Sequence, residues 1–300
     1  MTSADTTRED TRTWTVGALL SWTTERFERA GIEESRLDAQ HLLASAMGCK
    51  RMELFLRHGE EVAEDVRERF RGFVRRRLAR EPVAYIEGRR AFHGLGLDLH
   101  VDRRVLVPRP ETELLVDAVL DAMGPPPQPA ISVLDVGTGS GAIALAILHA
   151  RPFVRVTACD VSVDALAVAR LNAERLGLAP TFVHSDLTRE VVAPDDGFDV
   201  IVANLPYIAR SDIPTLAPEV RDHEPSLALD GGEDGLDLVR RLLVELDRPG
   251  LLAARARVFL EIGAGQAVAS LALLAARGYQ AWTTRDLAGV ERIVIGARAG

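Results

Sequence analysis

The stretch that decides the fold is VLDVGTGSGAIALAIL, residues 133–148. A short apolar segment leads through Gly137, Gly139 and Gly141 into a longer apolar segment. Glycines at such a point permit a tight turn and let a ligand approach the backbone closely. The pattern therefore predicts a buried strand, a ligand-binding loop and the beginning of a helix.

The same alternation of strand and helix continues along the chain. Strands are expected near 131–136, 154–159, 181–184, 198–203 and 256–261, and helices near 140–150, 162–176, 235–247 and 265–277. A last pair of strands, 279–284 and 291–296, has no helix between its members and is expected to be antiparallel. Parallel strands joined by crossover helices predict a doubly wound, seven-stranded, mostly parallel α/β sheet of the Rossmann-like type. Such sheets bind ligands beyond the carboxyl ends of their strands.

The residues before this alternation predict a separate, smaller domain. Apolar positions recur at helical spacing over residues 15–84, which are expected to form a helical bundle. The segment RAFHGLGLDLHVDRRVLVP (90–108) alternates apolar and polar residues around two glycines, and it predicts a β-hairpin linker over 85–108. Residues 109–300 then form the sheet domain, and the polar residues 1–14 are expected to be a flexible tail.

Composition places the chain among ordinary globular proteins. Its 300 residues are 47% hydrophobic and 27% charged, which is enough to bury a large core. No apolar run is long enough to span a bilayer and no signal peptide is expected, so we expect a cytoplasmic protein without membrane contact. Cys49 and Cys159 lack a partner motif, so neither a disulfide nor a metal site is expected. The net charge of −8 argues against stable binding to nucleic acid phosphates.

One dense basic run interrupts this acidic balance. It is interleaved with acidic residues and consists of Arg67, Arg69, Arg71, Arg75, Arg76, Arg77 and Arg80. A solvated helix face is the favoured interpretation, and contact with RNA or an acidic partner is the alternative.

Acidic residues mark the ends of three successive predicted strands. Asp135 stands just before the glycine turn, where it can meet the amino-acid end of a zwitterionic ligand but would repel a pyrophosphate. Asp160 can accept hydrogen bonds from both hydroxyls of a ribose. Asp186 and Leu187 can flank an adenine ring. The G-x-G-x-G spacing and Asp135 favour S-adenosylmethionine over a dinucleotide, whereas Asp160 suits a nucleoside-containing cofactor of either kind. Each acid taken alone also suits a helix N-cap.

The fourth strand ends in Asn204-Leu205-Pro206-Tyr207, at the same edge of the predicted sheet. A planar NH2 group offers two donors but is a poor nucleophile, because its lone pair is delocalised. The Asn204 side-chain oxygen and the Leu205 carbonyl can hold both hydrogens and turn the lone pair towards an electrophilic methyl group. The same acceptors stabilise the positive charge that develops on nitrogen. Pro206 keeps residue 205 extended, and Tyr207 offers a flat face to the substrate. An ordinary asparagine turn is the alternative.

Beyond these motifs, nearly the whole chain resembles the protein-glutamine methyltransferases that modify peptide chain release factors, a branch of the class I S-adenosylmethionine-dependent methyltransferases. The matching segments are EPVAYIEG (81–88), VLVPRPETE (105–113), LDVGTGSGAIAL (134–145), ANLPYI (203–208), PEVRDHEPSLALDGGEDGLD (218–237), EIGAGQ (261–266) and RDLAGVERIV (285–294). Many methyltransferases share the glycine loop and the Asn-x-Pro-Tyr motif. PRPETE and ALDGGEDGLD are far more particular to this branch.

The resemblance implies methylation of the side-chain amide of the glutamine in the Gly-Gly-Gln loop of release factors, in support of translation termination. Carried over by position, Gly137, Thr138, Gly139, Ser140, Gly141 and Asp160 would bind the methyl donor, with Leu187 near its adenine. Asp135, Asp186 and Asn204 are also expected at the donor site. Residues 204–207 would hold the target glutamine, and the N-terminal helices would help to recognise the release factor. The chain departs from the family at Leu205, where proline is usual. The backbone carbonyl survives this change, but a leucine does not lock its own φ.

Three other functions are weighed against this one. An adenine amino-methyltransferase also needs Asn-x-Pro-Tyr, but such enzymes flip a base and carry a basic surface. Residues 1–100 are neutral, with 17 Lys and Arg against 17 Asp and Glu. A non-catalytic RNA-binding module would rely on the arginine run, and an NAD-dependent oxidoreductase would need the missing G-x-G-x-x-G.

Overall fold

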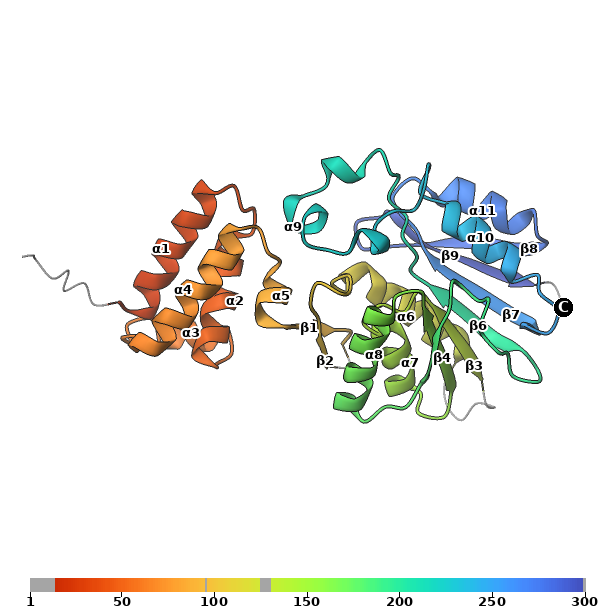
Figure 1. Cartoon of the computed structure of the whole chain (residues 1–300), viewed down its shortest axis with the longest axis horizontal. Helices are drawn as coiled ribbons and strands as arrows, with labels where there is room; N and C mark the ends of the chain where they lie inside the picture. The colour runs from red at the N-terminus through yellow and green to blue at the C-terminus, as the bar shows by residue number, and fades with distance from the viewer. Residues whose placement is uncertain (1–13, 95, 125–130, 299–300) are drawn as a thin grey trace, which may run out of the picture. The chain divides into compact units, whose positions relative to one another are not determined.

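The computed structural model of the protein describes residues 14–94, 96–124 and 131–298 (Figure 1). The chain forms two compact units, Met1–Glu87 and Gly88–Gly300. Apart from Trp14, the tail expected over residues 1–14 lies outside the described residues.

The first unit is a bundle of short helices, as expected. They are α1 (Val16–Arg29), α2 (Ser35–Met47), α3 (Glu53–Leu56), α4 (Glu64–Leu78) and α5 (Val83–Glu87). Thr15 caps α1 because its hydroxyl accepts from the Ala18 N–H at 3.2 Å, and Gly48 ends α2 in the left-handed conformation. Phe27 and Phe70 are fully buried in the core between the helices.

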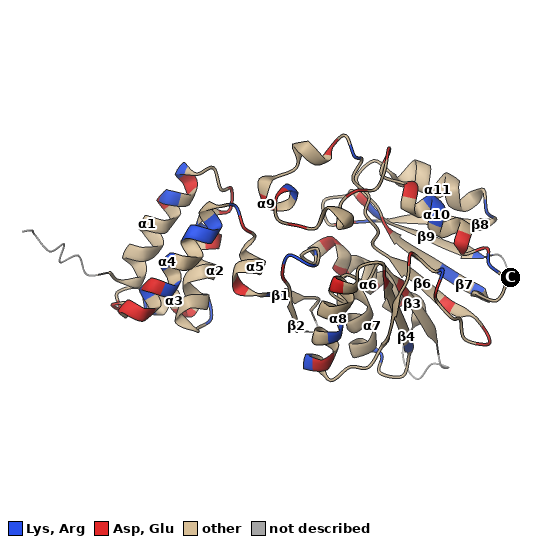
Figure 2. Ribbon diagram, in the orientation of Figure 1, with Lys and Arg blue, Asp and Glu red and all other residues tan. Residues whose placement is uncertain are grey.

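The arginine run lies mainly on α4, where neighbouring acids neutralise it. Acidic residues begin this helix and basic residues end it (Figure 2), an order that suits the helix dipole. The ion pairs are Arg67–Glu64, Arg69–Asp65, Arg71–Glu68, Arg75–Glu68 and Arg76–Glu81. Arg77 turns inward to Asp38 at 2.7 Å, and both side chains are buried. The pairing supports the interpretation of a solvated helix face.

The hairpin is shorter than the linker predicted over 85–108. Residues 83–87 form α5, and the hairpin consists of β1 (Arg89–Phe92) and β2 (Leu97–His100), paired antiparallel in the second unit. Next comes α6 (Pro110–Met123), with proline in its first turn and Glu111 and Glu113 at its positive end.

The second unit is built on the expected seven-stranded sheet. Its strands are β3 (Ser132–Val136), β4 (Arg155–Asp160), β5 (Thr181–His184), β6 (Phe198–Ala203), β7 (Leu252–Glu261), β8 (Tyr279–Arg285) and β9 (Glu291–Arg298). The spatial order is β5-β4-β3-β6-β7-β9-β8, parallel through β7 and antiparallel at β9 and β8. The order reverses between β3 and β6, which makes this the point where ligands bind in such sheets.

Helices cover both faces of the sheet (Figure 1). Alternate strand residues point to opposite faces, so Val133 packs on the side of α6, α7 (Ala142–Ala150) and α8 (Val163–Leu176). Leu134 packs on the side of α10 (Asp237–Glu245) and α11 (Ala267–Ala275). Burial of both faces explains why the central strands are apolar almost throughout.

Short helical turns fill the connection between β6 and α10, for which no element is predicted. They are η1 (Ile213–Thr215), α9 (Pro218–Arg221) and η2 (Ser226–Ala228). Within the described ranges, no helix combines the length and the apolar character that crossing a bilayer requires.

Candidate active site

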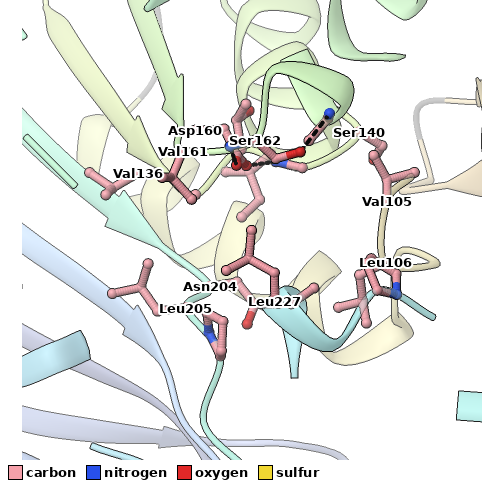
Figure 3. A pocket seen from close by; sticks show the side chains of 18 of the residues that line it. Val105, Leu106, Val136, Ser140, Asp160, Val161, Ser162, Asn204, Leu205 and Leu227 are labelled. Atoms are coloured by element: carbon pink, nitrogen blue, oxygen red, sulfur yellow. Dashed lines mark hydrogen bonds between the residues drawn. The ribbon is translucent and has the colours of Figure 1, made fainter. Parts of the chain in front are cut away.

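A cavity of about 320 Å³ opens beyond the carboxyl ends of β3, β4 and β6 (Figure 3). It lies where the strand order reverses, as the doubly wound topology predicts. Predicted site residues in its lining are Gly137, Thr138, Gly139, Ser140, Asp160, Asp186, Leu187, Asn204, Leu205 and Pro206. Residues of the segments 104–112 and 225–228, which carry no predicted role, are also part of the lining.

The glycine loop is held tightly to the neighbouring strand. The N–H groups of Gly137 and Thr138 donate to the Cys159 carbonyl at 2.9 and 3.0 Å. A Cβ at Gly137 would lie 3.1 Å from the Leu205 Cδ2 atom, so the side chain of Leu205 fills the space there. A Cβ at Gly139, which lines the cavity, would meet no protein atom within 4 Å. The loop therefore leaves room for a ligand at Gly139.

Asp135 lies beneath the loop and is not among the residues that line the cavity. Its Oδ2 atom accepts from the Thr138 hydroxyl at 2.6 Å and from the Ala144 N–H at 3.2 Å, which joins the loop to the first turn of α7. Among the described residues, its Oδ1 atom has no hydrogen-bond partner. Complete burial raises the pKa of Asp135 to about 7. Its contact with the amino-acid end of a donor stays a prediction.

Asp160 connects the glycine loop to the cavity. Its carboxylate accepts from the Gly139 N–H at 2.9 Å and from the Ser162 N–H at 2.8 Å (Figure 3). Burial raises the pKa of Asp160, and these backbone donors oppose that effect. The carboxylate is thus fixed at the end of β4, where a ribose diol can reach it.

Asp186 and Leu187 reach the cavity from the end of β5. The Arg241 guanidinium donates to both Asp186 oxygens at 2.7 Å, and Arg189 approaches the same carboxylate at 3.0 Å. Leu187 has a φ of 54°, which is unusual for a leucine, and its carbonyl accepts from the Cys159 thiol at 3.2 Å. Asp186 is thus ion-paired with two arginines, and the contact of Asp186 and Leu187 with an adenine ring stays a prediction.

The strand β6 brings Asn204 to the same cavity as residues 137–140 (Figure 3). The Asn204 Nδ2 atom donates to the Thr112 hydroxyl at 3.0 Å, so its Oδ1 atom is left for another donor. Tyr207 is not part of the cavity lining. Burial raises the pKa of the Tyr207 phenol to about 12, so this ring stays neutral.

Two segments without a predicted role, GGEDG (231–235) and EIGAGQ (261–266), contact the loop after β6 and hold it in position. The Gln266 Nε2 atom donates to the Tyr207 carbonyl at 2.9 Å. A Cβ at Gly235 would lie 2.2 Å from that same oxygen, and one at Gly231 would lie 2.7 Å from the Pro206 carbonyl. Close contact with the backbone of residues 206 and 207 therefore requires glycine at 231 and 235.

An ion pair joins the two further segments around the cavity. Arg109 donates to the Glu224 carboxylate at 2.6 Å, and only 1% of the Glu224 side chain is exposed. Burial raises the pKa of Glu224, and the Arg109 charge lowers it. The sequence signal for this pair is a charged residue inside each of two segments that carry the family resemblance, VLVPRPETE (105–113) and PEVRDHEPSLALDGGEDGLD (218–237), which lie far apart in the chain.

Known proteins match both units of the chain. A family model described as the PrmC N-terminal domain matches residues 18–88, and one described as a methyltransferase domain matches residues 133–223. A methyltransferase of known structure from Pyrococcus furiosus shares the fold, at 20% identity and a TM-score of 0.50 over 68% of this chain and 90% of that one.

Two curated relatives align over almost the full length. The release factor glutamine methyltransferase of Rhodopirellula baltica is 42% identical, over 94% of this chain and 95% of that protein. The one of Caulobacter vibrioides is 41% identical, over 95% of this chain and 97% of that protein. Identity of this degree over both units is sufficient to assign the family. The chain belongs to the release factor glutamine methyltransferase family.

Proposed function

We propose that this chain methylates the side-chain amide nitrogen of the glutamine in the Gly-Gly-Gln loop of peptide chain release factors, in support of translation termination. Its methyl donor is S-adenosylmethionine, which supplies an electrophilic methyl group bound to sulfur. The observation that carries the proposal is the position of Asn204 and Leu205 in the wall of the cavity that also contains the glycine loop. Family membership supports the same reaction.

The residues at the β6 end suit an amide substrate. Because the Asn204 NH2 group donates to Thr112, its oxygen is available to accept from the substrate NH2 group. With the Leu205 carbonyl as a second acceptor, both substrate hydrogens are held and the nitrogen lone pair faces the methyl group. The acceptors act more strongly in the transition state, where positive charge develops on nitrogen.

The other side of the cavity suits the donor. In this proposal Asp160 accepts from the ribose hydroxyls, and the donor approaches the backbone at Gly139. The bond that fixes the Asp160 carboxylate and the open space at Gly139 support this arrangement. Leu187 offers an apolar contact for adenine beside Asp186. Asp135 acts on the donor through the loop that it anchors.

The N-terminal helical unit is proposed to help recognise the release factor. The match to the PrmC N-terminal domain supports this role. The arginines on α4 pair with acids of the same unit, which disfavours a stable contact with nucleic acid. We place the reaction in the cytoplasm, where release factors act.

The proposed reaction is tested by mass spectrometry of a release factor incubated with the protein and labelled methyl donor. One added methyl group on the glutamine of the Gly-Gly-Gln loop is expected. A release factor with that glutamine replaced by alanine serves as the control and should remain unlabelled. Label on DNA or RNA oligonucleotides, with none on the release factor, would favour an adenine amino-methyltransferase instead.

Gly139→Ala is expected to raise the dissociation constant of the methyl donor by at least about 10-fold, because a methyl group would occupy space needed by the ligand. Calorimetric titration with S-adenosylmethionine measures this effect. Gly177→Ala is the matched control, since it also has a positive φ and open space around its Cβ position but ends α8 outside the cavity lining. Each change costs about 1 kcal/mol of stability. Equal donor affinity in the two variants contradicts the assignment.

Leu205→Pro is expected to leave turnover within about threefold of the original value, because the catalytic acceptor at this position is a backbone carbonyl. The leucine side chain is buried and packs beside Gly137, so the melting temperature is expected to fall slightly. Steady-state kinetics on release factor and a thermal melt measure both effects. A folded variant without activity would show that the loop conformation, and not its carbonyl, is decisive.

A further inference from the structure

A buried carboxylate stands behind Asn204. Glu261 is the last residue of β7, the strand beside β6, and only 3% of it is exposed. Its carboxylate interacts with the Thr112 hydroxyl and with the Asn204 side-chain amide. In the described part of the chain, its Oε2 atom has no hydrogen-bond partner. Burial of a carboxylate is costly, so its presence here calls for a reason.

Thr112 alone cannot fix the direction of the Asn204 amide. A hydroxyl both donates and accepts, so it can pair equally well with the NH2 group or with the oxygen of an asparagine. An ionised carboxylate only accepts. When Glu261 is ionised, the Thr112 proton points to Glu261, and the Thr112 oxygen must then accept from Asn204, as the 3.0 Å contact with Nδ2 shows.

The direction of the Asn204 amide decides whether the site works. With its NH2 group towards Thr112, the side chain presents an oxygen to the cavity. With the amide reversed, it would present NH2 to a substrate NH2, and two donors would face each other. A buried polar group left unpaired in this way costs about 1–3 kcal/mol.

We propose that Glu261 and Thr112 are positioning residues that set the Asn204 amide with its oxygen towards the substrate. The proposal rests on the proposed function of Asn204. It extends that function to Thr112, which lines the cavity, and to Glu261, which does not, and both act through Asn204. The Asn204 amide donates to Thr112 at 3.0 Å, and Glu261 interacts with both Thr112 and Asn204, so these residues connect α6 with the ends of β6 and β7 in the same unit.

The charges around Glu261 allow its ionisation to be tested. Burial raises the pKa of Glu261 to about 7; Glu111 at the beginning of α6 raises it further, and Arg292 on β9 lowers it. Tyr207, which also lies near Glu261, is neutral in this range. Protonated Glu261 can donate as well as accept. Below pH 7 it therefore no longer fixes the direction of the hydrogen bonds at Thr112 and Asn204. Turnover should therefore fall as the pH decreases through about 7.

Glu261→Gln tests the proposal because it preserves the shape and removes the acceptor-only character. We expect kcat on release factor to fall by about 10- to 100-fold at pH 8, with donor affinity unchanged. The fall in kcat below pH 7 seen in the unmodified protein should be absent. Thr112→Ser should retain activity, whereas Thr112→Val should behave like Glu261→Gln. Circular dichroism melts check that the variants fold.

A spectroscopic readout separates this proposal from the proposed function. The chain contains only two asparagines, Asn172 and Asn204, so selective ¹⁵N labelling yields two side-chain NH2 signals. The Asn204 signal should shift with pH near 7 in the unmodified protein and stay constant in Glu261→Gln. This result supports the positioning role even if the unmodified protein fails to methylate release factor, in which case only the proposed function fails. Unchanged kcat in Glu261→Gln, or an Asn204 signal that is insensitive to pH, overturns the positioning role.

Discussion

Asn204→Ala is expected to reduce turnover on release factor by on the order of 10²-fold or more while leaving the affinity for the methyl donor largely intact. The reason lies in the geometry of the cavity. Asn204 lines the same cavity as residues 137–140, and its NH2 group donates to Thr112 at 3.0 Å. In the proposed reaction, its oxygen accepts from the substrate nitrogen on which positive charge develops. Alanine removes that acceptor and leaves the glycine loop unchanged.

Two measurements together test this result. Single-turnover kinetics with labelled donor give the rate of methyl transfer, and calorimetry gives the donor affinity. Asn204→Ala also deprives Thr112 and Glu261 of a partner, so a thermal melt accompanies both measurements. A folded variant that methylates release factor at the original rate contradicts the role given to Asn204.

Local patterns in the sequence were sufficient to predict the fold and the position of the site. Apolar strands that are buried on both faces and helices with a period of 3.6 can be recognised from residues that lie close together in the sequence. The strand ends that follow them, at Asp160, Asp186 and Asn204, therefore reach the cavity as expected. The boundary of β7 was less well predicted: it begins at Leu252 and not near 256, because its first residues are partly exposed and only weakly patterned.

Contacts between distant segments were not predictable in this way. Glu261 is 149 residues from Thr112, and the local sequence EIGAGQ gives no indication that its first residue is buried against α6. The same holds for the pairing of Asp186 with Arg241 and for that of Arg109 with Glu224. Such pairs depend on how strands and helices are placed in space. Local sequence patterns do not show which distant segments become neighbours, because that is decided by the fold as a whole.

The position of Asp135 illustrates a further limit. An acid at the end of a strand next to a glycine turn suits direct contact with a ligand, and the sequence pattern favours that role. In the structure the carboxylate is buried outside the cavity lining, where it accepts hydrogen bonds from Thr138 and from the first turn of α7. A residue two positions before a tight turn can point to either side of the sheet, and strand periodicity alone does not show how the loop folds over it.

Asp160→Ala is expected to have the opposite effect from Asn204→Ala: the dissociation constant of the donor should rise by about 100-fold, with little change in kcat at saturating donor. The alanine variant loses the proposed acceptor for the ribose hydroxyls. It also frees the Gly139 and Ser162 N–H groups, which the carboxylate now holds at 2.9 and 2.8 Å. Both losses act on the donor side of the cavity, because Asn204 is fixed by other residues.

The matched control for this change is Asp164→Ala. Asp164 is an exposed acid in the first turn of α8, so its removal subtracts the same charge near the cavity without removing a lining residue. Calorimetry should show an unchanged donor affinity for this variant. Equal losses in the two variants would attribute the effect to net charge and would remove the ribose contact from Asp160. A loss confined to Asp160→Ala, together with the intact donor binding of Asn204→Ala, would divide the cavity into a donor half and an amide half.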